Sequence, residues 1–136
     1  LKKAKSLLYV LDNAGEIAFD KLVAQQFIDK DLSCVVRRAP VLNDATREDA
    51  EEVSLSSVCD VIDPGADVLG LPLDLCSGEF KERFKAADVV IVRGMANFET
   101  LEGATERPVY FLLVAKCQVV AKHLGIAVGE MVLLKE

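Results

Sequence analysis

The sequence predicts a three-layer α/β/α domain with a mostly parallel, Rossmann-like sheet. Short apolar runs alternate with amphipathic stretches along the chain, as strands alternate with helices in α/β folds. Residues 89–92 read Val-Val-Ile-Val, which is typical of a strand covered by helices on both faces. The spacing between the runs leaves room for the right-handed crossovers that join parallel strands. With 136 residues, the chain is expected to form one α/β domain over 1–136.

The boundaries of the elements follow from periodicity and from capping residues. Strands are expected at 6–11, 33–36, 57–62, 88–92, 109–114 and, as a closing edge strand, 129–134. Helices are expected at 17–30, 45–55, 78–87 and 116–124. Asp44 or Thr46 is the expected start signal of the second helix, and Ser77 that of the third. Gly125 is the expected end of the last helix.

Composition excludes several classes of partner. Lys plus Arg is 16 against 22 for Asp plus Glu, giving a net charge of −6. A chain this acidic is not expected to bind nucleic acid or an anionic membrane surface, because both need clustered cations. No apolar run reaches the roughly 20 residues of a spanning helix, and no signal peptide is recognisable. The four cysteines form no CxxC pair and adjoin apolar runs, which indicates free thiols and a cytoplasmic protein.

Ligands of open α/β sheets bind outside the carboxyl ends of the strands, so the residues that follow each strand indicate the site. Oxygen-bearing and cationic side chains follow four of the expected strands. They are Asp12, Asn13 and Glu16 after the first, Arg37, Arg38, Asn43 and Asp44 after the second, Arg93, Asn97 and Glu99 after the fourth, and Lys116 after the fifth. These groups are therefore expected to meet at one edge of the sheet.

The chemistry of this edge suits a divalent cation and a phosphate. Asp12, Asn13 and Asp44 offer the carboxylate and amide oxygens that Mg²⁺ or Mn²⁺ prefers. The arginines and Lys116 can hold a phosphate group. A simpler interpretation is that Asp12 and Asn13 only cap the first helix. A second Asn-Asp pair after the next strand favours a site over capping alone.

Other phosphatase and nucleotide-binding motifs are missing. Asp12 is not followed two residues later by the second aspartate of a haloacid-dehalogenase-type site. Cys76 and Arg83 are separated by six residues rather than the five of a cysteine phosphatase. No Gly-Lys-Ser/Thr loop or three-glycine dinucleotide fingerprint is present. The single histidine, His123, is best explained as a cation at the end of the last helix.

Five ordered motifs resemble one known family. They are Asp12-Asn13-Ala14-Gly15-Glu16 with Phe19-Asp20, Arg38-Ala39-Pro40 with Asn43-Asp44-Ala45-Thr46, Cys76-Ser77 with Glu79-Phe80, Arg93-Gly94 with Asn97-Phe98-Glu99, and Tyr110-Phe111-Leu112-Leu113 with Lys116-Cys117. Together they resemble the metal-dependent damage-control phosphatase family, long known as domain of unknown function 89. The resemblance implies a Rossmann-like domain that hydrolyses phosphomonoesters of small metabolites, such as sugar phosphates or cofactor-precursor phosphates.

The resemblance also implies roles for individual residues. Asp12, Asn13 and Asp44 match its metal-binding positions, for Mn²⁺, Mg²⁺, Ni²⁺ or Co²⁺. Asp12 and Lys116 are the implied catalytic pair, and either Asp12 or a metal-activated water is the nucleophile. The implied substrate-binding residues are Glu16, Arg38, Asn43, Arg93, Asn97, Glu99 and Lys116.

The resemblance is incomplete at one loop and at the start of the chain. Where the family usually reads Lys-Gly-Gln-Gly-Asn-Phe-Glu, residues 93–99 read Arg-Gly-Met-Ala-Asn-Phe-Glu. Lys and Arg differ in shape, so this loop bears on substrate choice. Family members also carry a mostly helical region before the first motif, so this domain is expected to come from a longer chain.

Two other functions are weighed beside the phosphatase. The altered residues Met95 and Ala96 are compatible with a sensor that binds a phosphorylated metabolite without hydrolysing it. A nucleotide-sugar or methyl-donor enzyme shares the expected architecture but needs a glycine-rich turn after the first strand, which this chain lacks.

Overall fold

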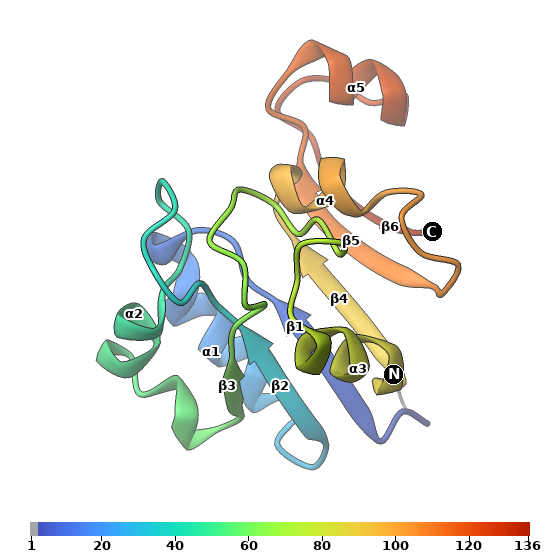
Figure 1. Ribbon diagram of the computed structural model, residues 1–136. Helices are drawn as coiled ribbons and strands as arrows, with labels where there is room; N and C mark the ends of the chain where they lie inside the picture. Colours follow the sequence, from blue (N-terminus) through green and yellow to red (C-terminus); the bar gives the residue numbers. More distant parts are fainter. Residues whose placement is uncertain (1–2) are drawn as a thin grey trace.

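A six-stranded sheet forms the centre of the computed structural model, which describes residues 3–136. The strands are β1 (Ser6–Val10), β2 (Asp31–Val35), β3 (Asp60–Ile62), β4 (Val89–Arg93), β5 (Val109–Val114) and β6 (Met131–Lys135). Their order is β3-β2-β1-β4-β5-β6 (Figure 1). The first five are parallel, and β6 runs antiparallel to β5 at the edge. The mostly parallel α/β fold predicted from the sequence is thus confirmed, including the closing edge strand.

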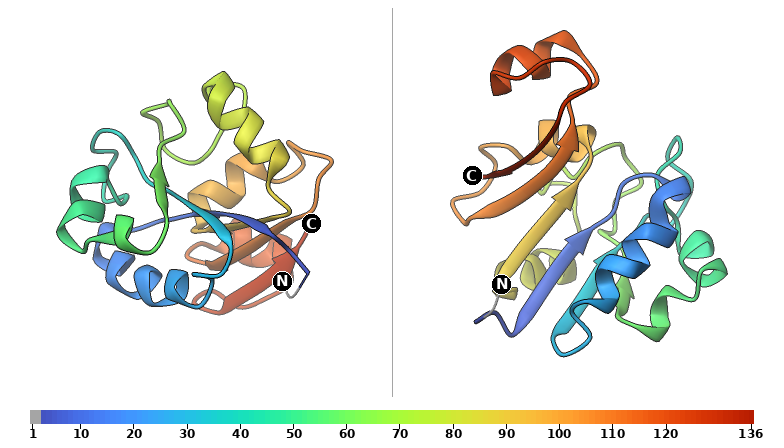
Figure 2. Two further views of the ribbon diagram at one scale, coloured as in Figure 1. Left: turned by 90° about the horizontal axis from the view of Figure 1, so that it is seen from below. Right: turned by 180° about the vertical axis from the view of Figure 1, so that it is seen from behind.

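Helices flank the sheet on both faces. They are α1 (Ile17–Gln25), α2 (Arg47–Glu52), α3 (Gly78–Ala86), α4 (Met95–Leu101) and α5 (Gln118–Leu124), with short 3₁₀ helices η1 (Ala14–Glu16) and η2 (Leu55–Ser57). In Figure 2, α1 and α2 lie on one side of the sheet, and α3 and α4 lie on the other. The chain therefore builds the three layers that its alternating pattern predicts.

Two hydrophobic clusters hold these layers together. Strand residues alternate between them, since Leu8 and Val10 of β1 face α3 and α4, whereas Leu7 and Tyr9 face α1. On the α3–α4 side, Phe98 packs edge-on against Phe111 of β5, with ring centroids 5.1 Å apart. Burying apolar area on both faces of β1 and β2 fixes the register of these strands and so the position of their carboxyl ends.

Several boundaries differ from those expected. Helix α1 ends at Gln25 rather than at residue 30, because the chain turns at 26–28 before it enters β2. The third strand begins only at Asp60, since residues 55–57 form η2. Helix α4 is a larger miss, because residues 95–101 were expected to be a loop. The apolar residues Met95, Phe98 and Leu101 are spaced three apart, as on one face of a helix. A segment of seven residues that follows a glycine is too short for this spacing to predict a helix clearly.

Capping residues behave as the sequence predicts. Thr46 begins α2 with a full capping box. Its hydroxyl accepts a hydrogen bond from the Asp49 amide, and the Thr46 amide donates to the Asp49 carboxylate. Ser77 caps α3, and Gly125 ends α5 with a φ of 69°. The Thr46 cap matters for function because it fixes the chain two residues after Asp44.

One half of the α1 face of the sheet is bare. Helices α1 and α2 cover β1 and β2, and no helix of residues 3–136 covers β4, β5 and β6 on this side (Figure 2, right). Met131 and Leu133 of β6 are 72% and 66% exposed. No helix in the described part of the chain is long and apolar enough to cross a membrane. All four cysteines are free thiols, as expected.

Candidate functional site

Two loops meet at the carboxyl edge of the sheet and are joined by backbone hydrogen bonds. The first loop carries Asp12 and Asn13 beyond β1, and the second carries Asn43 and Asp44 beyond β2. The Ala45 amide donates to the Asp12 carbonyl at 2.7 Å, and the Ala14 amide donates to the Asn43 carbonyl at 2.9 Å. Asn13 and Asp44 thereby form an isolated antiparallel bridge. The structure thus brings together the three residues that the sequence assigns to a metal ion.

The side chains of these loops are arranged by their amides. Asn13 donates from Nδ2 to Asp12 Oδ2 at 2.9 Å and to Glu16 Oε1 at 3.4 Å. Its Oδ1 accepts from Asn43 Nδ2 at 2.6 Å. The Asn13 side chain makes no capping bond to η1, and Glu16 makes none to α1. Because the Asn13 side chain hydrogen-bonds Asp12, Glu16 and Asn43 instead of the helix backbone, helix capping does not explain its presence at this position.

Asp44 is held by a buried arginine. The Asp44 side chain is 9% exposed, and its Oδ2 accepts from Arg37 Nε at 2.8 Å. Arg37 also donates from Nη2 to the Gly70 carbonyl at 2.6 Å and to Asn97 Oδ1 at 3.1 Å. The sequence names both Arg37 and Arg38 as cations of this edge but cannot show which one is buried. Neighbouring strand-end residues point to opposite sides of the sheet, and the structure turns Arg37 inward.

Asp12 and Asp44 reach the same space. Both line a narrow cavity between the ends of β1 and β2, together with Arg37 and apolar neighbours. Burial raises the pKa of the Asp12 carboxyl; Lys116 opposes this, and the nearby Asp44 and Glu16 carboxylates add to it. Two close carboxylates fit a hard divalent cation. Asn13 lies beside them, with its Nδ2 toward Asp12 and its Oδ1 toward Asn43. Residues 3–136 contain no group of three or more His, Cys, Asp or Glu side chains placed to hold a metal ion, at this edge or at any other position.

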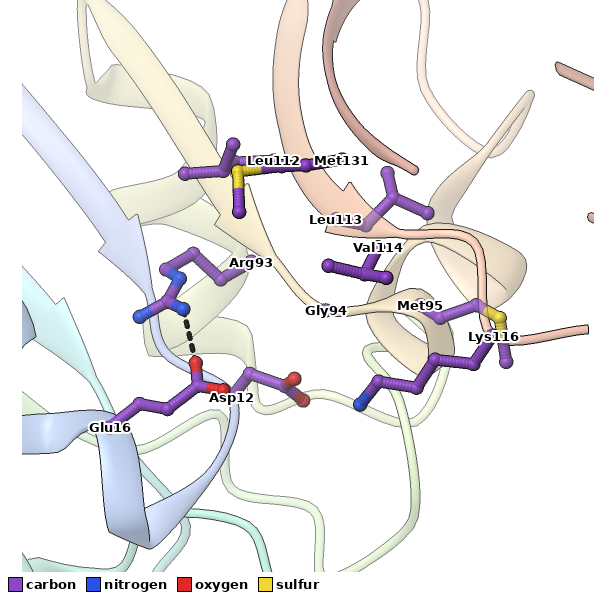
Figure 3. A pocket seen from close by; sticks show the side chains of 10 residues that line it. All are labelled: Asp12, Glu16, Arg93, Gly94, Met95, Leu112, Leu113, Val114, Lys116 and Met131. Atoms are coloured by element: carbon purple, nitrogen blue, oxygen red, sulfur yellow. Dashed lines mark hydrogen bonds and ion pairs between the residues drawn. The ribbon is translucent and has the colours of Figure 1, made fainter. Parts of the chain in front are cut away.

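A second pocket opens beside Asp12, and the cationic side chain of Lys116 lines it (Figure 3). Lys116, beyond β5, extends toward the Asp12 carboxylate across this pocket. Lys116 is exposed and takes part in none of the ion pairs formed among residues 3–136. The opposite wall is apolar, with Leu112, Val114 and Met131 from β5 and β6. An anionic group entering here would meet Lys116 beside the two-carboxylate cavity.

Arg93 lines the same pocket but is already paired. Its guanidinium binds Glu16 through one nitrogen and Asp20 through another. Asp20, on α1, is 1% exposed and also accepts from the Tyr9 hydroxyl at 2.6 Å. Burial and the Asp20 carboxylate raise the pKa of Tyr9, so this hydroxyl stays a proton donor. The sequence predicts that Arg93 holds a phosphate group. In the structure, the Glu16 and Asp20 carboxylates already neutralise its charge.

Gly94 allows β4 to pass close to Asp12. Its φ is 89°, and a Cβ built on it would lie 2.3 Å from Asp12 Oδ1. A side chain at this position is therefore excluded both by backbone conformation and by space. Gly94 belongs to one of the five ordered motifs, and the structure shows that glycine is needed there because the Asp12 carboxylate occupies the space of a side chain.

The remaining expected substrate-binding residues lie at different depths. Asn97 is 1% exposed and donates to the Leu11 and Arg93 carbonyls, so it braces the site from beneath. Arg38 is exposed and pairs with Asp67 at 2.7 Å. Glu99 is exposed on α4, and neither it nor Arg38 lines the pockets that contain Asp12.

The strand order β3-β2-β1-β4-β5-β6 is that of a Rossmann-like α/β domain, and Asp12, Asp44 and Lys116 lie at the carboxyl edge of its sheet. The family model described as "Damage-control phosphatase ARMT1-like domain" matches residues 1–132, so the chain belongs to that family. This confirms the resemblance seen in the ordered motifs.

Individual relatives agree with this membership. The chain is 44% identical to an uncharacterized protein of Methanocaldococcus jannaschii, with 98% of the chain aligned. It is 37% identical to damage-control phosphatases of Pyrococcus horikoshii and Archaeoglobus fulgidus, over 99% and 93% of the chain. A crystal structure of a DUF89 family protein from Pyrococcus horikoshii superposes with a TM-score of 0.93 at 37% identity, over 98% of this chain and 48% of that one. The chain spans 45–48% of the length of the curated relatives.

Proposed function

We propose that this chain carries the active site of a metal-dependent phosphatase that hydrolyses phosphomonoesters of small metabolites, including sugar phosphates and cofactor-precursor phosphates. The observation that carries the proposal is the convergence of Asp12 and Asp44 on one cavity beside the free Lys116. Membership of a damage-control phosphatase family supports the same chemistry. The acidic balance of the chain agrees with a small anionic substrate rather than a nucleic acid.

Asp12, Asn13 and Asp44 are the residues that would hold the divalent ion, either Mn²⁺, Mg²⁺, Ni²⁺ or Co²⁺. The ion supplies Lewis-acid polarisation of a phosphoryl oxygen when it is bound. Lys116 binds the phosphate from the opposite side of the pocket and neutralises the charge on its outer oxygens during displacement. Asn13 keeps the Asp12 carboxylate oriented through its 2.9 Å hydrogen bond.

The other residues of the edge have supporting roles in this proposal. Arg93 holds Glu16 at the mouth of the pocket instead of gripping the phosphate, because both of its terminal nitrogens are paired. Asn43 holds the Asn13 amide, and Asn97 braces the floor. Arg38 and Glu99 lie at the periphery, where they can contact only the part of a substrate that extends beyond the phosphate.

The test is hydrolysis of p-nitrophenyl phosphate during titration with Mn²⁺ and Mg²⁺. We expect metal-stimulated turnover by the wild-type chain and a loss of at least about 100-fold in Asp44→Asn, since removing a carboxylate ligand removes transition-state stabilisation. Asp74→Asn is the matched control, because Asp74 is exposed and lines neither pocket.

Wild-type turnover by Asp44→Asn would overturn the assignment of the site. Tight binding of a phosphate ester with no metal-stimulated turnover would favour the sensor hypothesis instead. The altered loop residue Met95, which lines the pocket beside Lys116, is the observation that keeps this second function in view.

A further inference from the structure

Arg37 connects more segments of the site than any role in binding phosphate requires. Its guanidinium is buried, with the residue 5% exposed, so it cannot meet a ligand in the open pocket. It contacts the Asp44 carboxylate, the Gly70 carbonyl and the Asn97 amide oxygen, which belong to three different segments. A planar guanidinium with several fixed donors is suited to holding such a geometry.

The hydrogen bond from Arg37 occupies one of the two carboxylate oxygens of Asp44. Oδ2 accepts from Arg37 Nε, whereas no hydrogen bond among residues 3–136 uses Oδ1. The backbone reinforces this arrangement, because the Arg37 amide donates to the Ala45 carbonyl at 2.8 Å. The Asp44 carboxylate is therefore fixed at both its backbone and its side chain, and it offers one oxygen to a cation.

Asn97 extends the same connection to Asp12. Its Oδ1 accepts from Arg37, and its Nδ2 donates to the Leu11 carbonyl at 3.2 Å and the Arg93 carbonyl at 2.8 Å. Leu11 directly precedes Asp12 at the end of β1. One buried chain of hydrogen bonds thus runs from the Asp44 carboxylate to the backbone that carries the second carboxylate.

We propose that Arg37 is the positioning residue of the metal site: it holds Asp44 with a single oxygen free and, through Asn97, sets the spacing between Asp44 and Asp12. This inference rests on the proposed function, since it concerns the cation that the phosphatase needs. Partners that orient metal-binding carboxylates set metal affinity as well as geometry, and their loss typically lowers affinity about 10- to 100-fold.

Arg37→Lys separates positioning from charge. Lysine keeps the positive charge beside Asp44 but cannot span three acceptors. We expect Mn²⁺ binding to the free chain, measured by calorimetry without substrate, to weaken at least about tenfold. The Mn²⁺ concentration for half-maximal turnover should rise by the same factor, whereas the KM for p-nitrophenyl phosphate at saturating Mn²⁺ should stay unchanged.

Arg47→Lys is the matched control. Arg47 of α2 pairs with Asp63 through two nitrogens at 3.0 and 2.7 Å, and its side chain takes no part in the chain of bonds from Asp44. This variant should bind Mn²⁺ within about twofold of wild type, since no metal-orienting partner changes. Circular dichroism and thermal unfolding establish that each variant is folded.

The outcomes separate this inference from the proposed function. If the wild-type chain binds Mn²⁺ and the folded Arg37→Lys variant binds it equally well, the inference is wrong and the proposed function stands. If the wild-type chain binds no Mn²⁺, both are overturned. Should Arg37→Lys not fold, Asn97→Ser breaks the same chain of bonds at its second link, and unchanged Mn²⁺ affinity in that variant overturns the inference.

Discussion

At the scale of single residues, the site contains charged groups whose burial disfavours their ionised form in the folded chain, and Asp12 is the clearest example. Asp12 is moved out of water beside Asp44 and Glu16, and burial is the largest cause of its raised pKa. Arg37 and Arg93 are each committed to carboxylates beneath or beside the pocket. Lys116 is the exposed cation left to receive an anion there. Active sites commonly concentrate such perturbed groups and lose some stability by doing so.

The raised pKa of Asp12 gives a prediction for stability. A carboxyl whose pKa is higher in the folded than in the unfolded chain weakens folding once it ionises, so stability falls as pH rises from the ordinary value of 3.8 through the raised one. That deficit persists at neutral pH. We therefore expect Asp12→Asn to unfold at a higher temperature than wild type at pH 7 with a metal chelator present, and to lose Mn²⁺ binding.

Thermal unfolding from pH 3 to pH 8 measures the effect. The difference between Asp12→Asn and wild type should shrink toward acid pH, where Asp12 is protonated in both folded and unfolded chains. Asp74→Asn should show no such trend. A lower midpoint for Asp12→Asn at pH 7 would contradict the prediction.

At the scale of elements, the junction between β4 and α4 determines how the site is closed. Strand β4 ends at Arg93, Gly94 reverses the chain, and α4 begins at Met95 and places Asn97 beneath the site. Phe98 and Leu101 of α4 bury themselves in the core, so the helix is fixed by packing rather than by length. The junction therefore couples core packing to the position of Asn97.

Gly94→Ala tests this junction. The added methyl would overlap the Asp12 carboxylate and sit on a backbone with positive φ, so we expect a loss of about 1–3 kcal/mol in unfolding free energy and a strong loss of turnover. Urea denaturation measures the first effect, and metal-stimulated hydrolysis measures the second. Gly78→Ala is the control, because it lies in the first turn of α3 with no atom within 4 Å of the new Cβ. Equal stability of Gly94→Ala and wild type would refute the overlap.

At the scale of the whole molecule, the sheet is covered unevenly. One face is packed under α3 and α4, whereas the β4–β6 half of the other face presents apolar side chains to solvent, including Leu133 of β6. Exposed apolar surfaces of this kind promote association. The bare surface begins at the apolar wall of the Lys116 pocket, since Leu112, Val114 and Met131 belong to both.

The bare face predicts concentration-dependent self-association of the isolated chain. Replacing exposed apolar side chains there by lysine should reduce association without lowering stability by more than about 0.5 kcal/mol, because these positions make few packing contacts. We expect the double variant Met131→Lys, Leu133→Lys to sediment as a monomer at concentrations where the wild-type chain associates. Leu42→Lys, which replaces an exposed side chain in the loop between β2 and α2, is the control. Identical sedimentation of all three would contradict the prediction.

Much of the fold was predictable because its causes are local. The alternation of apolar runs, the cap residues Thr46 and Ser77, and the terminating Gly125 act over a few residues, and the structure confirms each of them. Helix α4 was missed because its stability comes from Phe98 packing on β5, which no short pattern contains. The expected end of α1 and the expected start of β3 were wrong because a turn at 26–28 and the 3₁₀ helix η2 interrupt the apolar runs.

The sequence by itself determined the order along the chain of the strands and of the α-helices other than α4. It also determined the family and the oxygen-bearing residues Asp12, Asn13 and Asp44 that follow β1 and β2. Only the tertiary structure decided that Arg37 is buried against Asp44, that Arg93 is neutralised by Glu16 and Asp20, and that Lys116 remains free. The physical reason is that residue type and spacing fix which groups reach the edge of the sheet. Which charges then pair depends on distances between segments up to 77 residues apart, and these exist only in the folded chain.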